Sequence, residues 1–287
     1  MSTQTHTATA RRPRAGARLA ARLLATPLLT MTVGCATGDA ELTSDYNYER
    51  FDIQHYDHSS LPGPWAGQPA VDATLFGLDG TEVRLSDFKG KRIVLETGSL
   101  SCPAYRQHIA PMTHVAASHR GADTVFLVVY VREAHPGHRM PRFETLAEKI
   151  DRAQSVAERE PRETRALLVD DVAGSFHRAY GSMPNMVYVI DPSFRVAFRS
   201  DWTHPAMVDQ ILAHSGELPI VDAEHYVPSG GSALRSIGIL LEAGPGALFD
   251  ALRESLAMRR AWRRAATYYE AHGTLKRDVL PTDNVME

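Results

Sequence analysis

Apolar and polar residues alternate along the chain in blocks that predict strands and helices. Continuous apolar runs rich in β-branched residues are typical of strands buried on both faces of a sheet. The predicted strands are 92–96, 124–131, 166–169, 186–190 and 195–198. The helices predicted from apolar residues at helical spacing are 106–120, 145–159, 172–180 and 205–214. This order predicts an α/β fold, a mixed central sheet covered by helices on both faces.

The sheet is preceded by a predicted hairpin and a predicted linker. Two short alternating segments flank Asp79-Gly80, a pair typical of tight hairpin turns. Residues 36–64 are polar and end in a cluster of prolines and glycine, which predicts a linker. We therefore expect the folded domain to span residues 65–215.

Residues 216–287 predict a helical C-terminal extension. The strongest element there is a helix at 247–272, on which Leu248, Leu252 and Leu256 form one stripe and five arginines lie elsewhere. We expect this helix to pack on the domain as an appendage with a solvated basic face. A helix that lies on an anionic membrane is the alternative.

The first 35 residues have the layout of an export signal. Five arginines and no acid precede an apolar run that ends at Gly34-Cys35. This layout predicts a lipoprotein-type signal with Cys35 as the lipidated residue, and an exported protein that is periplasmic or anchored to a membrane through its N-terminus. The apolar run is too short to span a bilayer. The alternative is a cytoplasmic protein with a disordered N-terminal extension.

Charge and cysteine content restrict the possible partners and the redox chemistry of the chain. The formal charge is −3, and the basic residues of the N-terminus hide a more acidic body, so we expect no nucleic-acid partner. Cys35 and Cys102 are the two cysteines. If Cys35 is lipidated or removed, Cys102 has no partner within the chain. An oxidised Cys102 then needs an external thiol reductant.

Cys102 is the strongest candidate for chemistry. It lies between the strand at 92–96 and the helix at 106–120, where helix N-terminal amides favour an anion and lower the pKa of a thiol. We therefore predict a reactive, ionised and accessible nucleophile. A buried structural cysteine is the alternative.

A second polar segment, Glu133-Ala134-His135-Pro136, follows the strand at 124–131. Loops that follow parallel strands gather at one edge of a sheet, so we expect this segment to meet Cys102. His135 could supply a proton and Glu133 could fix its tautomer. Metal binding by Cys102, His135 and His138 is a weaker alternative, because no paired C-x-x-C spacing occurs, and we expect no metal site.

Pro184 immediately precedes a predicted strand. We expect its peptide bond to be cis and to present the neighbouring backbone to the sulfur of Cys102. An ordinary trans turn is the alternative.

Over residues 66–215 the chain resembles the thioredoxin superfamily and, within it, the iodothyronine deiodinases. The segments that carry the resemblance are 98–103, 126–136, 179–181 and 187–190. The resemblance implies a thioredoxin-like fold and reductive removal of iodide from an aromatic ring. It places the selenocysteine of the family at Cys102, and its active-site Glu and His at Glu133 and His135. Leu100 stands where the family often carries a second cysteine.

The resemblance also implies roles for residues around the nucleophile. Ser99 and Ser101 would line its loop and could hydrogen-bond the sulfur, and Tyr105 and Pro184 would contact substrate. The expected substrate is a halogenated phenol, with an external thiol as reductant and no bound cofactor.

Two other functions stay open. A thiol peroxidase acting on a peroxide would suit Ser99, three residues before Cys102, although Leu95 stands where such enzymes place a proline. A non-catalytic thioredoxin-like binding module would leave Cys102 unreactive. The sequence also leaves the oligomeric state open, a homodimer included.

Overall fold

The computed structural model describes residues 46–56, 62–121, 123–221 and 231–272. The predicted export signal and Cys35 lie outside the described residues, as does much of the predicted linker. Among the helices in these four ranges, none combines the length and the apolar character needed to cross a membrane.

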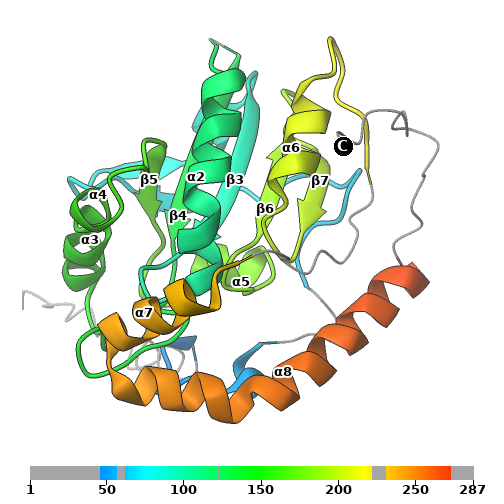
Figure 1. The fold of residues 1–287 in the computed structure, drawn as a ribbon. Helices are drawn as coiled ribbons and strands as arrows, with labels where there is room; N and C mark the ends of the chain where they lie inside the picture. The colour runs from blue at the N-terminus through cyan, green and yellow to red at the C-terminus, as the bar shows by residue number, and fades with distance from the viewer. Residues whose placement is uncertain (1–45, 57–61, 122, 222–230, 273–287) are drawn as a thin grey trace, which may run out of the picture. The chain divides into compact units, whose positions relative to one another are not determined.

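A seven-stranded mixed sheet forms the centre of the fold (Figure 1). In sheet order its strands are β2 (Glu82–Arg84), β1 (Thr74–Phe76), β5 (Ala166–Val169), β4 (Thr124–Tyr130), β3 (Arg92–Gly98), β6 (Val187–Ile190) and β7 (Val196–Ser200). β3, β4 and β5 run parallel, and β6 and β7 pair antiparallel at one side. β1 and β2 form the predicted hairpin. This is the thioredoxin-like α/β arrangement that the resemblance implied.

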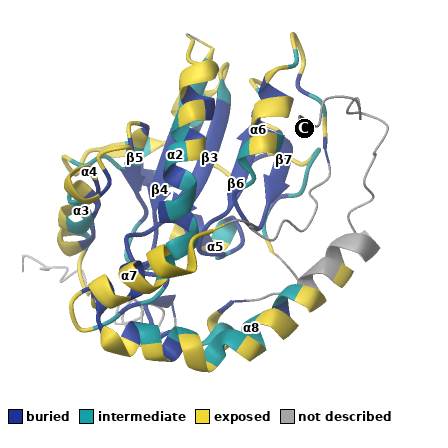
Figure 2. Ribbon diagram, viewed as in Figure 1, coloured by how far each residue is buried: buried dark blue, intermediate teal, exposed yellow. Residues whose placement is uncertain are grey.

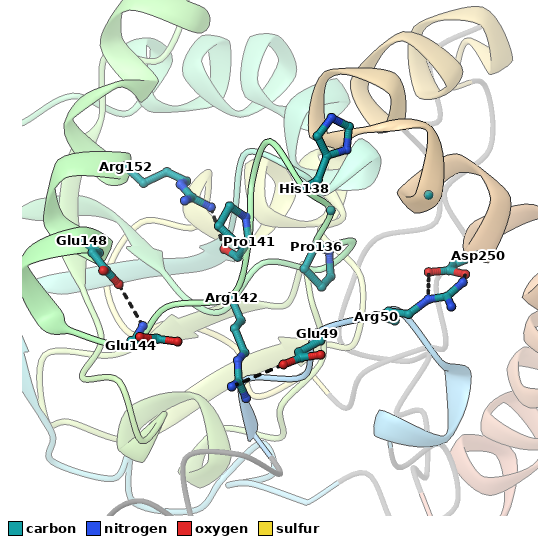
Figure 3. Close-up of a pocket in the computed structure, with 12 residues that line it drawn as sticks. Glu49, Arg50, Pro136, His138, Pro141, Arg142, Glu144, Glu148, Arg152 and Asp250 are labelled. Atoms are coloured by element: carbon teal, nitrogen blue, oxygen red, sulfur yellow. Dashed lines mark hydrogen bonds and ion pairs between the residues drawn. The ribbon is translucent and has the colours of Figure 1, made fainter.

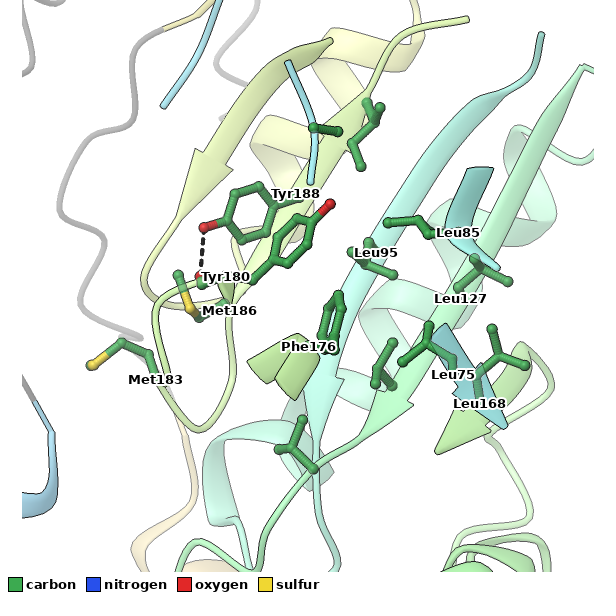
Figure 4. Packing of buried hydrophobic residues seen from close by; sticks show 14 of the residues in the cluster. Leu75, Leu85, Leu95, Leu127, Leu168, Phe176, Tyr180, Met183, Met186 and Tyr188 are labelled. Carbon is green, nitrogen blue, oxygen red and sulfur yellow. Dashed lines mark hydrogen bonds between the residues drawn. The ribbon is translucent and has the colours of Figure 1, made fainter. Parts of the chain in front are cut away.

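Side chains of the central strands enter two separate cores, because successive residues of a strand point to opposite faces. On one face Leu95 packs in a cluster with Phe176 and Tyr180 (Figure 4). On the other face the neighbouring Val94 packs in a cluster with Met112. Burial on both faces explains why these strands read as continuous apolar runs.

Helices cover both faces of the sheet. They are α2 (Pro103–Ser118), α3 (Leu146–Gln154), α4 (Val156–Arg159), α5 (Ser175–Ala179) and α6 (Pro205–Leu212), with the short 3-10 helices η1 (Ile53–His55) and η2 (Leu85–Phe88). α2 and α6 pack side by side on one face (Figure 1). The helix predicted at 145–159 is divided at Ser155, which caps the end of α3 and precedes α4.

Residues 46–56, here called the N-terminal arm, belong to the fold. The side chains of Tyr46, Tyr48 and Tyr56 are buried, and their ring centres lie 4.8–4.9 Å from the guanidinium of Arg132. Arg132 also donates hydrogen bonds to the carbonyl oxygens of Tyr46 and His55. The prediction of a linker is wrong for the arm, because its aromatic rings bury apolar surface and enclose a cation.

Two helices form the C-terminal extension, α7 (Ala233–Ala243) and α8 (Pro245–His272). α8 packs on the domain through Met258 and Trp262, as expected of an appendage. The predicted leucine stripe is not its packing face, because Leu252 and Leu256 are 62 % and 66 % exposed. Figure 2 shows exposed positions recurring along α8. The sequence does not predict α7.

Candidate active site

Cys102 occupies the predicted joint between β3 and α2. It is the N-cap residue of α2, and its Sγ accepts a hydrogen bond from the backbone N–H of Tyr105 at 3.5 Å. The loop of Glu133 and His135 follows β4, which pairs in parallel with β3. The two loops therefore lie at the same edge of the sheet, which confirms the sequence prediction.

Three hydrogen bonds join the two loops. The backbone N–H of Ser101 donates to Oε2 of Glu133 at 3.0 Å. The Oγ atoms of Ser99 and Ser101 accept from the backbone N–H groups of Ala134 and His135 at 3.1 and 3.0 Å. Both serines are fully buried. Their hydroxyl oxygens thus fix the loop around Cys102, while the sulfur accepts from the amide of Tyr105.

The carboxylate of Glu133 binds residues other than His135. Its Oε1 accepts from the hydroxyl of Tyr130 at 2.7 Å and lies 3.4 Å from the guanidinium of Arg152. The expectation that Glu133 orients the imidazole is therefore wrong in this conformation, because both carboxylate oxygens are engaged elsewhere. Tyr130 and Arg152 are not among the site residues that the sequence predicts. For Tyr130 a signal existed, since it lies within the strand that leads into the Glu-Ala-His-Pro segment.

The thiol of Cys102 is shielded from solvent. Cys102 is 2 % exposed and packs in a cluster with Tyr105 and Ala134. This burial raises the pKa of the thiol from 9.0 to about 12, although the backbone N–H groups at the start of α2 lower it. The predicted net lowering is wrong in this conformation, and so is the predicted accessibility. Loss of solvation disfavours the thiolate more than the helix amides favour it.

The imidazole of His135 lies against the ring of Phe51, with 4.2 Å between the ring centres. Burial lowers the pKa of His135 to about 4. The imidazole is therefore neutral at pH 7 and is a weak base in this buried position.

Tyr105 and Pro184 occupy different surroundings. Tyr105 is fully buried and its hydroxyl donates to Oε2 of Glu163 at 3.0 Å, so the expected contact with substrate is not available in this conformation. The peptide bond before Pro184 is trans, like every peptide bond in the described ranges, so the expectation of a cis bond is wrong. The preceding carbonyl, of Met183, is held by the imidazole of His177 at 2.7 Å.

Several hollows border the site, and two of them are lined by residues of the loop that carries Glu133 and His135. A polar cleft of about 640 Å³ runs beside the Glu133 loop (Figure 3), and its lining includes His138, Arg142 and Arg152. The second hollow, here called the aromatic pocket, has a volume of about 30 Å³. Its lining residues are Phe51, Ile53, Tyr56, His135, Met183, Pro184, Trp202, Met258 and Trp262. Within the described ranges, no three His, Cys, Asp or Glu side chains are grouped to hold a metal ion.

Comparison with known proteins places the chain in a family. The model of the iodothyronine deiodinase family matches residues 50–202, which include Cys102, Glu133 and His135. The chain belongs to the iodothyronine deiodinase family. The N-terminal arm from residue 50 onward lies within the match, whereas α7 and α8 lie beyond it.

Curated relatives of this deiodinase-family chain are thyroxine 5-deiodinases. That of Gallus gallus is 31 % identical over 137 residues, which cover 43 % of this chain and 52 % of the relative. That of Sparus aurata is 31 % identical over 121 residues, which cover 38 % and 44 %. The chain thus spans about half the length of the curated relatives it matches.

Solved structures that resemble this deiodinase-family chain include the exposed lipoprotein thioredoxin Etrx1 of Streptococcus pneumoniae. It has a TM-score of 0.39 and 24 % identity, and the match covers 50 % of this chain and 98 % of that one. A putative thiol:disulfide interchange protein DsbE from Chlorobium tepidum has a TM-score of 0.39 and 22 % identity, with 50 % and 89 % covered.

Proposed function

We propose that this protein reductively removes iodide from an aromatic phenol, with Cys102 as the nucleophile. Membership of the deiodinase family and the thioredoxin-like fold support a thiol-dependent redox function. One structural observation carries the finer proposal. The three hydrogen bonds between the loops hold Cys102 next to the Glu133-Ala134-His135 segment, which belongs to one of the segments that carry the resemblance to this family.

The reaction balances with two equivalents of an external thiol. The thiolate of Cys102 attacks the iodine, the sulfur–iodine bond forms, and the carbon–iodine bond breaks with its electron pair left on the ring carbon. That carbon takes a proton, which His135 or water supplies. An external thiol then displaces iodide from sulfur and leaves a mixed disulfide. A second thiol releases Cys102 and departs in an external disulfide.

The structure corresponds to a resting form in this scheme. The thiol is protonated and covered, so the reaction requires an opening that exposes Cys102 and removes its proton. His135 directly follows Ala134, which packs in the cluster of Cys102. We assign its imidazole as the proton acceptor in the opened form, where renewed contact with water restores its basicity. Ser99, Ser101 and Glu133 are positioning residues that hold the loop, and Pro184 contacts the substrate ring from the aromatic pocket.

A non-catalytic binding module is the second candidate function. It is favoured by the 2 % exposure of Cys102 and by the raised pKa of its thiol. A module that never opens would keep this cysteine unreactive towards every substrate.

Iodide release from a panel of iodinated phenols, with dithiothreitol as reductant, separates these functions. We expect the full chain to release iodide, Cys102→Ser to release none above background, and Cys35→Ser to match the parent as the control for cysteine replacement. Mass spectrometry should detect a mixed disulfide on Cys102. Hydrogen peroxide consumption without iodide release would instead identify a thiol peroxidase, and inactivity towards both would support the binding module.

We also propose that the protein is exported and anchored through a lipid on Cys35. The basic, apolar and Gly34-Cys35 layout of the N-terminus supports this localisation. Expression of the full chain in bacteria with an alkyne-labelled fatty acid should label the protein, and Cys35→Ser should abolish the label. Equal labelling of the two chains would contradict the proposal.

A further inference from the structure

Three side chains of the aromatic pocket carry a buried nitrogen without a hydrogen-bond partner. These atoms are Nδ1 of His135, Nε1 of Trp202 and Nε1 of Trp262. Trp202 is 7 % exposed, and its ring meets that of Trp262 edge-on with 5.8 Å between the ring centres. Buried polar atoms are normally paired, so a group of unpaired ones around one hollow requires an explanation.

The two indole groups restrict the kind of ligand that could satisfy them. An indole N–H donates a hydrogen bond and cannot accept one, so the ligand must present an acceptor atom. None of the nine residues that line the pocket is Lys, Arg, Asp or Glu. A neutral oxygen acceptor therefore suits this pocket better than a phosphate or a carboxylate does.

The remaining lining selects for a flat and polarizable group. The rings of Phe51 and Tyr56 and the thioethers of Met183 and Met258 surround the hollow. Aromatic rings pack well edge-on or offset against other rings, and thioethers make favourable contacts with ring edges. Together with the indole donors, this lining fits an aromatic ring that bears an oxygen.

The aromatic pocket also adjoins the nucleophile. Ala134 packs in the same cluster as Cys102 and directly precedes His135, whose ring lines the pocket. A ring held against His135 and Pro184 would thus lie at the edge of the sheet where Cys102 begins α2.

We propose that the aromatic pocket binds a phenol or aryl ether whose oxygen accepts hydrogen bonds from Nε1 of Trp202 and of Trp262. This inference rests on the proposed function for the identity of the ligand as the substrate. Met258 and Trp262 belong to α8, beyond the part of the chain that matches the family. The extension then determines which aromatic compounds this protein accepts.

Ligand entry requires one wall of the pocket to move. A volume of about 30 Å³ has room for a single water molecule and not for an aromatic ring. α8 supplies the wall on the side of Met258 and Trp262, and its outer face is exposed. Outward displacement of this helix therefore admits the ring without disturbing the sheet.

Calorimetric titration of the full chain carrying Cys102→Ser measures binding without turnover. The probes are 4-iodophenol and iodobenzene, which differ by the hydroxyl group. Trp202→Phe and Trp262→Phe each keep a ring and remove the N–H. The matched control is Trp65→Phe, which replaces the one tryptophan of the chain that does not line the pocket. Circular dichroism and Tm verify that each variant is folded.

We expect 4-iodophenol to bind at least tenfold more tightly than iodobenzene. Each pocket substitution should weaken 4-iodophenol about five- to tenfold and leave iodobenzene and the Trp65→Phe control unchanged. Should Trp202→Phe fail to fold, Trp262→Phe on the partly exposed α8 still gives the answer. Absence of 4-iodophenol binding, or equal binding by all folded variants, would overturn the inference. Tight, tryptophan-dependent binding without iodide release from the parent chain would instead overturn the proposed function alone.

Discussion

The backbone N–H of Ser101 donates to the Glu133 carboxylate at 3.0 Å, which ties the residue before Cys102 to the loop that follows the neighbouring strand. The Glu133 side chain is 1 % exposed and is also bound by Tyr130 and Arg152. A buried carboxylate with three fixed donors is a rigid acceptor. The position of Cys102 at the edge of the sheet therefore depends on a residue that the resemblance had assigned to chemistry.

Replacement of Glu133 tests this positioning role. Glu133→Ala leaves the Ser101 amide and the Tyr130 hydroxyl without their acceptor and Arg152 without its partner. We expect a loss of about 3 kcal/mol in the free energy of unfolding, measured by urea denaturation. Glu133→Gln keeps the shape and should lose less. Glu82→Ala, at an exposed position of β2, is the control and should change stability by less than about 0.5 kcal/mol. An equally small change in the free energy of unfolding of Glu133→Ala would contradict the positioning role of Glu133.

The ionisation of Cys102 can be followed by alkylation. Because burial raises the pKa of its thiol to about 12, the thiolate fraction at pH 7 is very small and should rise about tenfold per pH unit. We expect the rate of iodoacetamide labelling in the Cys35→Ser background to increase steadily up to pH 11. The same chain in urea should instead be half-maximal near pH 9 and level off about one pH unit higher. The same half-maximal pH in the folded chain would show that the thiol is solvated.

The sequence predicts the sheet well because both faces of its central strands are buried. Strands such as β4 then appear as uninterrupted apolar runs, and parallel pairing alone brings the Cys102 and Glu133 loops to one edge. The ionisation of Cys102 could not be predicted in the same way. Its raised pKa comes from burial among Tyr105, Ile109, Val128 and Ala134. Some of these residues are close to Cys102 in the sequence, but the sequence does not show that their side chains close over the thiol.

The N-terminal arm shows the same limit. In the sequence its polar and aromatic residues resemble those of a linker. In the structure its tyrosines enclose the guanidinium of Arg132, which lies more than 70 residues away in the chain. Likewise, the leucine stripe of α8 predicts a packing face, yet the helix packs through Met258 and Trp262. Which face of an amphipathic segment is buried depends on its partner, and local periodicity does not identify that partner.

Arg132 should control how firmly the arm is held. Arg132→Gln removes the cation from three aromatic rings and its hydrogen bonds to the carbonyls of Tyr46 and His55. We expect a loss of about 3 kcal/mol of local stability. Amide hydrogen exchange in residues 46–56 should therefore be accelerated about a hundredfold, as measured by mass spectrometry. Arg178→Gln, an exposed residue whose guanidinium lies 5.8 Å from the Tyr46 ring centre, is the control. Equal exchange rates for residues 46–56 in the two variants would contradict the role of Arg132 in holding the arm.

The neutral imidazole of His135 predicts a pH dependence of stability. Its pKa falls from 6.5 to about 4 on folding, so between these two pH values the imidazole is protonated in the unfolded chain and neutral in the folded chain. The resulting stabilisation is fully present above pH 6.5 and is lost as the pH falls to 4. The carboxyl of Asp170 acts in the opposite sense, because burial raises its pKa to about 6 and it gains stability as the pH falls. The stability of the parent chain alone therefore does not isolate His135.

The difference between the parent and His135→Gln does isolate it, because Asp170 is common to both. We expect the free energy of unfolding of the parent to fall by about 3 kcal/mol more than that of the variant between pH 7 and pH 4, measured by urea denaturation. His114→Gln, in an exposed position on α2, should follow the parent curve. Parallel curves for the parent and His135→Gln would show that the imidazole of the folded protein is open to solvent and free to take up a proton.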